Sequence, residues 1–321
     1  MKKTIYCSIF LVLLSKLALA QDPVFTQYYN VLQFVNPGFA GYNESLNAGL
    51  LHRTQWPDMN LRVDSDYGFF NTWIDEMNSG IGVNVLSNRE QTNGYNFTQV
   101  NLNYAYKVAL SDSWIFRPGL EVGYGNKSYG FGNLLLGDQI NASTGAISPT
   151  SVDPSVLRSK VGFFDMSAGL LFNNETSWFG FSVKHLNKPN ISLLENGNAP
   201  LDMFMNVTVG HEIQNLEEKI GSQIFPTDTK LLLTANFMKQ GAFSRLDVGT
   251  ILTVNSFYVG PTFSLNPTKN TPGASTLISV NPSFGLLYEN FKLGLSYDYN
   301  TTPIGKTGGV YELSLTYHIA D

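Results

Sequence analysis

Histidine, serine and cysteine are the residues from which metal or hydrolytic chemistry would be built, and the chain gives them no recognisable arrangement. The four histidines are scattered, at His52, His185, His211 and His318. Only His211 has a carboxylate beside it, Glu212, but adjacent side chains of a strand point to opposite faces, so the two would not share a metal ion. No G-x-S-x-G sequence and no phosphate-binding glycine loop occurs. We therefore expect no metal site and no cofactor.

Nucleophilic catalysis is equally weakly indicated. A hydrolase at the rim of a barrel would need Ser279 or Ser314 to meet a histidine, and nothing in the sequence singles out either serine. The single cysteine, Cys7, lies in a stretch that we expect to be removed, which leaves neither a disulfide nor thiol chemistry. The sequence thus favours a protein that is not an enzyme.

The first twenty residues have the order of a secretory signal peptide. Lys2 and Lys3 precede an apolar run, 5–14, and Ala18-Leu19-Ala20 precedes Gln21. The apolar run is too short to span a bilayer as a helix. Removal of residues 1–20 takes away three lysines and no acid, so the formal charge changes from −5 to −8. This acidic balance argues against nucleic acid as a partner.

Strict alternation of apolar and polar residues organises the rest of the chain, most clearly in 291–300 and 308–319. Period-two alternation indicates strands with one apolar and one polar face. We predict fourteen strands, at approximately 44–53, 63–70, 79–87, 96–110, 114–128, 161–173, 177–186, 202–213, 228–239, 244–254, 256–266, 277–289, 291–300 and 308–319. Only 14% of residues are charged while 13% are aromatic, which suits strands with half their positions facing water.

Two all-β architectures could use such strands, a soluble sandwich and a transmembrane antiparallel barrel. Segments of 10 to 15 residues exceed the usual length of strands in soluble sheets, and so many outward apolar rows would aggregate in water. Connections also alternate between short and long, as in outer-membrane barrels. Two of the expected short turns, 71–78 and 214–227, are long exceptions. We predict an outer-membrane barrel over 44–321, closed by the final hairpin.

The polar faces of the predicted strands carry charges that would lie in the lumen. They are Arg117, Glu121, Asp165, Lys184, Asp247 and Asp298. Ion pairs across the lumen are the expected arrangement, and a permeation filter is the alternative. Inward glycines such as Gly123, Gly125, Gly260 and Gly294 would let the wall bend or let a plug approach its backbone.

Residues 21–43 do not alternate and precede the first strand. Their aromatic residues follow neither a helical nor a strand period over any useful length. We expect an ordered lead-in, periplasmic or acting as a plug, that packs on or in the barrel. The alternative is a loose periplasmic arm.

Three stretches together resemble the PorP/SprF family of Bacteroidetes type IX secretion proteins. Gln21-Asp22-Pro23-Val24-Phe25-Thr26-Gln27-Tyr28 and Asn36-Pro37-Gly38-Phe39-Ala40-Gly41 are similar to the family's Q-D-P-x-F-S-Q-Y and N-P-A-x-A-G. Arg53-Thr54-Gln55-Trp56 matches R-x-Q-W. The end matches G-x-S-Y-D-x-N and G-x-x-E-x-S-L, in residues 294–300 and 309–315. The marks lie at both ends of the mature chain and after the first strand.

The resemblance implies a barrel of the type IX secretion machinery, exported to the outer membrane. It implies that the barrel supports secretion or surface attachment of a cargo, such as a large adhesin, through the cargo's C-terminal domain. It also implies periplasmic partners that link the barrel to the secretion complex or to peptidoglycan, besides the outer-membrane lipid. A transport channel for a small or apolar solute, with 21–43 as its plug, is the alternative function.

The matching positions provide the candidate contact residues for plug and partners. They are Gln27, Tyr28, Asn36, Pro37, Phe39, Arg53, Trp56, Asp298 and Asn300. We expect Tyr28, Asn36, Pro37, Phe39 and Trp56 to cluster at one plug or rim site.

Overall fold

The computed structural model describes residues 22–59, 61–92, 94–130, 135, 137–152, 159–194, 196–221, 224–268, 276–302 and 307–319. The expected signal peptide therefore lies outside the described residues. Within them, no helix has the length and apolar character needed to cross a membrane.

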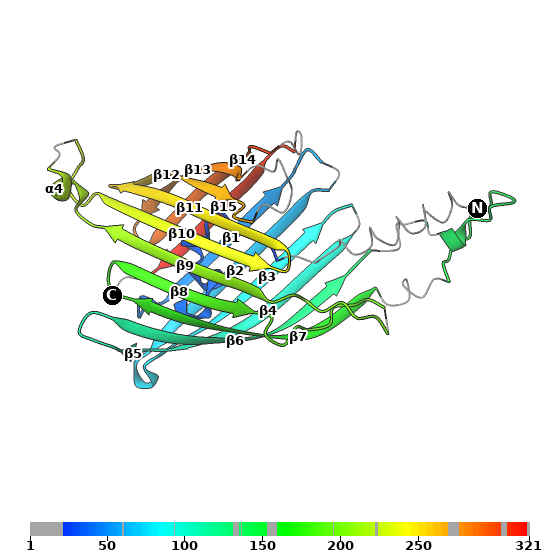
Figure 1. Cartoon of the computed structure of the whole chain (residues 1–321), viewed down its shortest axis with the longest axis horizontal. Helices are drawn as coiled ribbons and strands as arrows, with labels where there is room; N and C mark the ends of the chain where they lie inside the picture. Colours follow the sequence, from blue (N-terminus) through cyan, green and yellow to red (C-terminus); the bar gives the residue numbers. More distant parts are fainter. Residues whose placement is uncertain are drawn as a thin grey trace.

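The chain forms a closed antiparallel barrel of fourteen strands, as the alternation predicts (Figure 1). The fourth strand is interrupted at Lys107, so that β4 and the two-residue β5 both pair with β6. The first and last strands, β1 and β15, pair along their whole length and close the ring. The strands are β1 (Asn47–Gln55), β2 (Val63–Ile74), β3 (Ser79–Glu90), β4 (Tyr95–Tyr106), β5 (Val108–Ala109), β6 (Ile115–Ser128), β7 (Lys160–Asn173), β8 (Ser177–Lys184), β9 (Phe204–Ile213), β10 (Lys230–Gln240), β11 (Phe243–Val254), β12 (Phe257–Leu265), β13 (Leu277–Tyr288), β14 (Phe291–Asn300) and β15 (Val310–His318).

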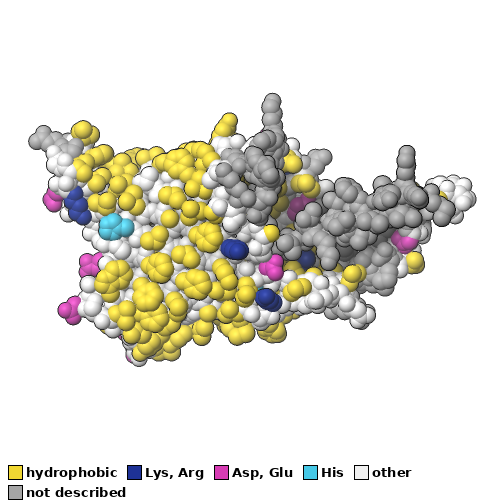
Figure 2. Space-filling model, in the orientation of Figure 1, with side chains coloured by type: hydrophobic (Ala, Val, Ile, Leu, Met, Phe, Trp, Pro, Cys, Tyr) yellow, Lys and Arg dark blue, Asp and Glu magenta, His cyan; other side chains and the backbone are white. Residues whose placement is uncertain are grey.

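Apolar side chains face outward and polar side chains face inward, which is the reverse of a soluble protein. On β4, Leu102 is 62% exposed whereas its neighbours Asn101 and Asn103 are both 5% exposed. On β6, Leu120 is 60% exposed and Glu121 is 3% exposed. Figure 2 shows the outer wall covered by apolar side chains, with charged residues towards its ends. Such a surface needs hydrocarbon rather than water around it.

The connections divide between the two ends of the barrel. The end that carries the long connections 129–159, 185–203, 266–276 and 301–309 is called the loop end here, and the opposite end is called the turn end. The expected long turn at 71–78 is short, because β2 continues to Ile74 and only η3 (Asp75–Met77) and Asn78 follow. The 214–229 connection stays long and carries α4 (Leu216–Ile220), which projects beyond the barrel (Figure 1).

The lead-in runs through the lumen as a plug. It contains η1 (Tyr28–Asn30), α2 (Leu32–Val35) and η2 (Pro37–Phe39). Asp22 is bonded at the loop end, by His185 and Gln240. Glu44 is bonded at the turn end, by Lys107 and Arg117. The segment 22–44, called the plug segment below, therefore crosses the barrel from the loop end to the turn end before β1 begins.

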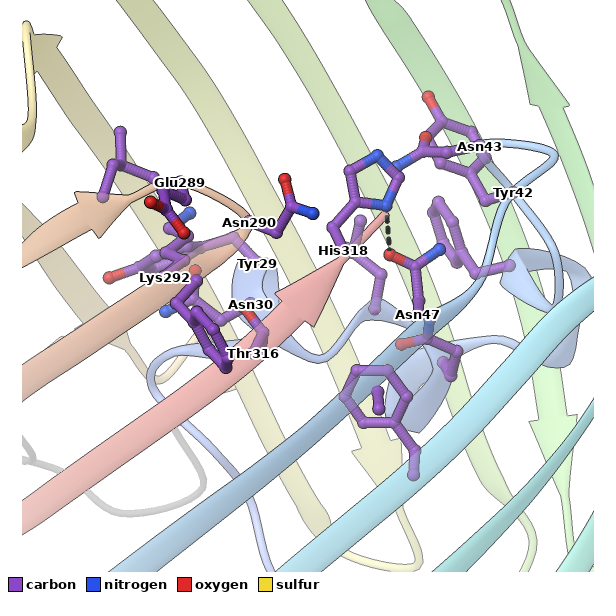
Figure 3. Close-up of a pocket in the computed structure, with 17 residues that line it drawn as sticks. Tyr29, Asn30, Tyr42, Asn43, Asn47, Glu289, Asn290, Lys292, Thr316 and His318 are labelled. Atoms are coloured by element: carbon purple, nitrogen blue, oxygen red, sulfur yellow. Dashed lines mark hydrogen bonds between the residues drawn. The ribbon is translucent and has the colours of Figure 1, made fainter. Parts of the chain in front are cut away.

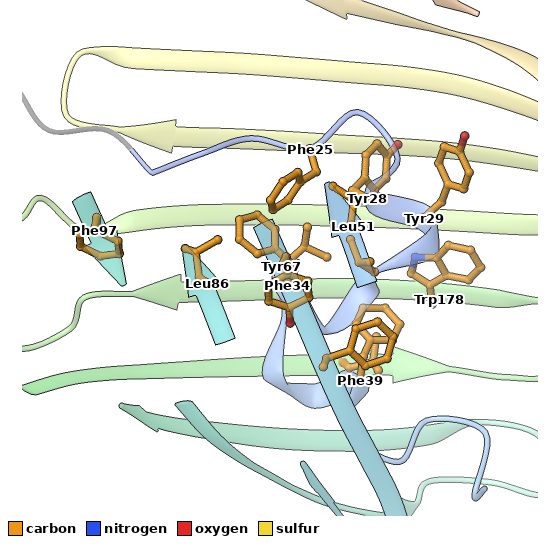
Figure 4. Packing of buried hydrophobic residues seen from close by; sticks show 14 of the residues in the cluster. Phe25, Tyr28, Tyr29, Phe34, Phe39, Leu51, Tyr67, Leu86, Phe97 and Trp178 are labelled. Carbon is orange, nitrogen blue, oxygen red and sulfur yellow. The ribbon is translucent and has the colours of Figure 1, made fainter. Parts of the chain in front are cut away.

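An aromatic cluster holds the plug segment against one side of the wall (Figure 4). Phe34 packs edge-on against Phe25 and against Tyr67 of β2, with ring centroids 4.7 and 5.3 Å apart. Phe39 packs edge-on against Trp178 of β8, at 6.4 Å. Burial of these rings, at about 25 cal/mol per Å² of apolar surface, is the main apolar force that keeps the segment inside.

The direction of the plug segment makes a topological prediction. Asp22 lies at the loop end, and the long connections of bacterial barrels face the cell exterior. A short epitope placed directly before Asp22 should therefore be reached by antibody on intact cells. An epitope within 137–152, on a long connection, is the positive control, and one within α4, at the turn end, is the negative control. Labelling of the Asp22 epitope only after outer-membrane permeabilisation, with the controls behaving as stated, would contradict this path.

Candidate functional site

Five residues from distant parts of the sequence form a polar lock between the plug segment and the wall. They are Thr26 and Gln27 of the plug segment, Arg53 of β1, Asp298 of β14 and Glu312 of β15. The backbone N–H groups of Thr26 and Gln27 donate to the two oxygens of Glu312, at 2.8 and 2.9 Å. Two successive N–H groups on one anion form a favourable nest. Arg53 pairs with Glu312 and, at 3.3 Å, with Asp298.

Side chains complete the polar lock. The Thr26 hydroxyl donates to Asp298 Oδ2 at 2.7 Å. The Gln27 amide donates to the Ser296 hydroxyl at 3.2 Å and its carbonyl accepts from the Ser314 hydroxyl at 2.8 Å. All of these residues are buried. A buried charge is tolerated only when it is paired and hydrogen-bonded, so this end of the plug segment supplies bonds that Glu312 and Asp298 need.

A second pair of charges lies beside the polar lock on β11. Arg245 Nε donates to both oxygens of Asp247, at 2.7 and 3.0 Å, and its Nη2 reaches the Thr26 hydroxyl at 3.3 Å. The expected lumen ion pairs are therefore present for Asp247 and Asp298, and each adjoins Thr26.

A row of small residues crosses five neighbouring strands and seats the middle of the plug segment. The residues pair directly from strand to strand: Gly80, Ala105, Gly119, Gly169 and Ser182. We call them the small-residue row. A Cβ on Gly119 would lie 2.4 Å from Gly38 N, and one on Gly80 would lie 2.0 Å from Ala40 O. Only glycine lets the two backbones approach this closely.

Asn36 anchors the segment that lies on the small-residue row. Its side-chain oxygen accepts from Gly38 N at 2.8 Å and so caps η2, whose first residue is Pro37. Its side-chain amide donates to the carbonyls of Leu170 and Phe181, at 3.1 and 3.2 Å. The N-P-G-F-A-G sequence thus forms a turn that fits against the wall. Asn36 makes hydrogen bonds both within this turn and to the wall.

The two ends of the plug segment are fixed by ion pairs. At the turn end the fully buried Arg117 lies 3.1 Å from Glu44 and donates to Gly41 O at 3.3 Å.

At the loop end His185 Nε2 lies 2.7 Å from Asp22, and its Nδ1 lies 2.8 Å from Asp165 of β7. Burial lowers the pKa of His185, but the two carboxylates outweigh it and raise that pKa to about 10. Burial raises the pKa of Asp22, and His185 reverses this and lowers it below its usual range.

Four of the candidate residues line one cavity at the loop end, called the vestibule here. Arg53, Trp56, Asp298 and Asn300 border this cavity of about 350 Å³, together with Asp22 at the beginning of the plug segment. Gln27 reaches the same region from below, through the polar lock. Arg53, Asp298 and Gln27, from the three stretches that resemble the family, are therefore neighbours in space.

The remaining candidates lie elsewhere on the plug segment. Tyr28 bonds Thr234 of β10 at 3.1 Å, whereas Asn36, Pro37 and Phe39 lie at the small-residue row. Trp56 is not among them, because it directly follows β1 at the loop end. The structure therefore divides the expected single cluster between the vestibule and the interior.

Several residues of the site could not be selected from sequence alone. Glu312 was one of many polar residues on strands, although it lies within the G-x-x-E-x-S-L match. Thr26 stood inside the matched lead-in. Nothing in the sequence indicated that Glu44, Arg117 and His185 form the ion pairs at the ends of the plug segment.

The turn end contains a second cavity, of about 340 Å³, in which the plug segment meets β14 and β15 (Figure 3). Lys292 of β14 lies over the ring of Tyr29, 5.7 Å from its centroid. His318 Nδ1 lies 2.6 Å from Asn47 Oδ1. Amide, cationic and aromatic groups thus face the turn-end opening.

The serine–histidine geometry that a hydrolase would need is incomplete in the described part of the chain. Ser314 bonds Gln27 and Asn30 rather than a histidine. Ser177 Oγ lies 2.8 Å from His211 Nδ1, but this pair is on the outer face at the turn end. No described carboxylate bonds His211, so the pair lacks the group that would orient it.

The apolar outer wall, the hydrophilic lumen and the internal plug segment define an outer-membrane β-barrel. The chain belongs to the PorP/SprF family of type IX secretion system membrane proteins, whose model matches residues 18–317. Family and fold indicate a membrane protein of secretion or transport.

Solved structures with a similar fold include two outer-membrane channels. The toluene transporter TodX of P. putida has a TM-score of 0.51 at 7% identity, covering 91% of this chain and 94% of TodX. The monoaromatic hydrocarbon channel CymD has a TM-score of 0.50 at 11% identity, covering 93% and 94%. At these identities the likeness concerns the fold alone. No curated protein matches the chain.

Substitution in the small-residue row should dislodge the plug segment. Gly119→Val would place side-chain atoms where Gly38 now lies, and such overpacking costs about 1–3 kcal/mol. We expect faster protease cleavage within 22–44 and a larger conductance in planar bilayers. Gly137→Ala is the matched control, because a Cβ there meets nothing within 4 Å. An unchanged cleavage rate in correctly inserted Gly119→Val would show that this contact does not hold the segment.

The His185 pair should make attachment of the loop-end part of the plug segment pH-dependent. The stabilisation from His185 is complete below its unfolded pKa, near 6.5, and is lost as pH rises towards about 10. The stabilisation from Asp22 is present above 3.8 and is lost as pH falls through its lowered pKa. Besides Asp22 and Asp165, Lys184 is the charged group nearby.

Amide hydrogen exchange of residues 22–27 measures this attachment. We expect slower opening at pH 6 than at pH 10, after correction for intrinsic exchange, and loss of the difference in His185→Gln. A pH dependence that persists unchanged in His185→Gln would rule out this histidine as its origin.

Proposed function

We propose that the protein is a non-enzymatic barrel of the type IX secretion system that supports secretion or surface anchoring of one cargo protein. The observation that carries this proposal is the convergence of the three family-like stretches on the polar lock, where Gln27, Arg53 and Glu312 meet. Residues spread over the whole chain are devoted to holding a plug segment in the lumen. The loop-end vestibule beside that lock is a suitable place for a cargo C-terminal domain to engage.

Docking of periplasmic partners is the second part of the proposal. If the turn end faces the periplasm, as short turns do in bacterial barrels, two features are presented there. One is α4, where Ile220 is 54% exposed beyond the wall. The other is the turn-end cavity with Lys292 and His318. A secretion-complex or peptidoglycan-linked protein would find both on the same side.

A channel for a small or apolar solute is the alternative, because TodX and CymD have this barrel architecture. The lumen around the described plug segment argues for the first proposal. The buried apolar side chains there pack against one another rather than line an open path, since Phe34, Tyr67 and Phe39 all belong to one cluster. The polar lock closes the adjoining space with paired charges.

Deletion of the gene tests the two functions against each other. We expect the deletion to remove one cargo protein from the surface proteome and to leave uptake of small solutes unchanged. The wild-type gene should restore the cargo. Complementation with Thr26→Val, which removes the hydrogen bond to Asp298 and leaves the Arg53–Glu312 pair at the seam, should restore barrel insertion but reduce display of that cargo. Reduced solute uptake with an unchanged surface proteome would favour the channel.

A further inference from the structure

The vestibule has a composition that neither the family nor the plug segment explains. Besides the charged floor it is bordered by neutral hydrogen-bonding side chains from several strands, including Gln55, Ser65, Asn88, Ser279, Asn300 and Thr302. Two large aromatic residues, Trp56 and Phe243, also border it. A cavity of about 350 Å³ is within the range of small-molecule sites.

Most of the carboxylate oxygens beneath the vestibule are already bonded within the protein. Both oxygens of Glu312 accept from the plug segment, and both oxygens of Asp247 accept from Arg245. Asp298 accepts from Thr26 and Arg53 through Oδ2, whereas its buried Oδ1 has no partner in the described part of the chain. These three carboxylates exceed the two guanidinium groups, so a carboxylate ligand would add a second uncompensated negative charge. A cationic ligand would have to displace existing donors from Glu312 and Asp247, whose oxygens are all occupied.

Trp56 is held at the rim in a conformation that its side chain does not favour. Its φ is +57°, in the left-handed region that bulky residues rarely adopt. The surroundings enforce this conformation, since Trp56 N donates to Gly309 O at 3.0 Å and Trp56 O accepts from Met59 N at 3.1 Å. Backbone strain of this kind gathers at binding sites, and here it fixes an indole at the vestibule mouth.

We propose that the vestibule binds a neutral saccharide unit. A sugar ring offers hydroxyl oxygens that can accept from the side-chain NH2 groups of Gln55, Asn88 and Asn300. The carbonyl oxygens of these amides already accept from Arg53, Ser65 and Thr302. Its apolar C–H face packs on an indole, as Trp56 provides. The saccharide comes either from a free oligosaccharide or from the sugar portion of an outer-membrane glycolipid. The proposal does not depend on the secretion role.

Intrinsic fluorescence tests the proposal on the full mature protein in phospholipid nanodiscs, which avoids detergents with sugar headgroups. The probes are glucose, galactose, mannose, N-acetylglucosamine and diacetylchitobiose. We expect a saturable change with at least one of them, at a Kd of about 1 mM or lower. Trp56→Phe should abolish the change, and Trp114→Phe, which alters a 39% exposed tryptophan at the turn end, should keep it.

A second variant separates binding from the optical signal. Asn88→Ala should weaken saccharide binding about tenfold by calorimetry, which is the effect of losing about one hydrogen bond. Nanodiscs with and without lipopolysaccharide distinguish the two sources: a glycolipid in the vestibule would prevent the free sugar from binding. No saturable binding up to about 10 mM, binding insensitive to Asn88→Ala, or binding only of a carboxylate-bearing peptide such as Gly-Gly-Asp would overturn the proposal.

Discussion

A carboxylate enclosed in the lumen must find both a counter-charge and hydrogen bonds, and Glu312 finds them at the seam of the barrel. Arg53 and Glu312 are direct cross-strand partners of β1 and β15, the strands whose pairing closes the ring. The N–H groups of Thr26 and Gln27 then occupy both oxygens of Glu312. Closure of the wall and seating of the plug segment therefore share one ion pair, and removal of Arg53 would leave Glu312 and Asp298 without this counter-charge.

The small-residue row also seats the plug segment, but by close steric fit instead of by paired charges. Where the polar lock attracts the plug segment, the row only makes room for it, so that backbone can lie on backbone. Asn36 shows how the two requirements combine, because one side chain caps η2 and also bonds the carbonyls of Leu170 and Phe181. A larger amide at position 36, or a larger residue on the wall, would preserve either the hydrogen bonds or the close backbone contact at the expense of the other.

Period-two alternation was sufficient to predict all fourteen strands, because each lipid-facing row must be apolar in sequence. Val63–Ile74 was nevertheless predicted too short, since Asn71 and Thr72 interrupt the pattern although the backbone continues to pair. The route of the plug segment was not readable, because irregular backbone leaves no period. Nor could His185 be assigned, since its partners Asp22 and Asp165 are distant in sequence and meet only once the barrel has closed. The family-like matches identified Arg53, Asp298 and Gln27 as candidate residues, but they did not predict that the three meet at the polar lock.

The path of the plug segment also constrains assembly. Residue 22 lies at the loop end while β1 begins at the turn end, so the segment must occupy the lumen over its whole length. Threading it through a finished ring would require carrying Asp22 past the buried charges of Arg245 and Arg53. Folding the wall around the segment avoids this step, and it lets Glu312 gain its backbone donors at the moment β15 pairs with β1. The shared ion pair thus makes a correctly placed plug segment a condition for favourable closure of the barrel.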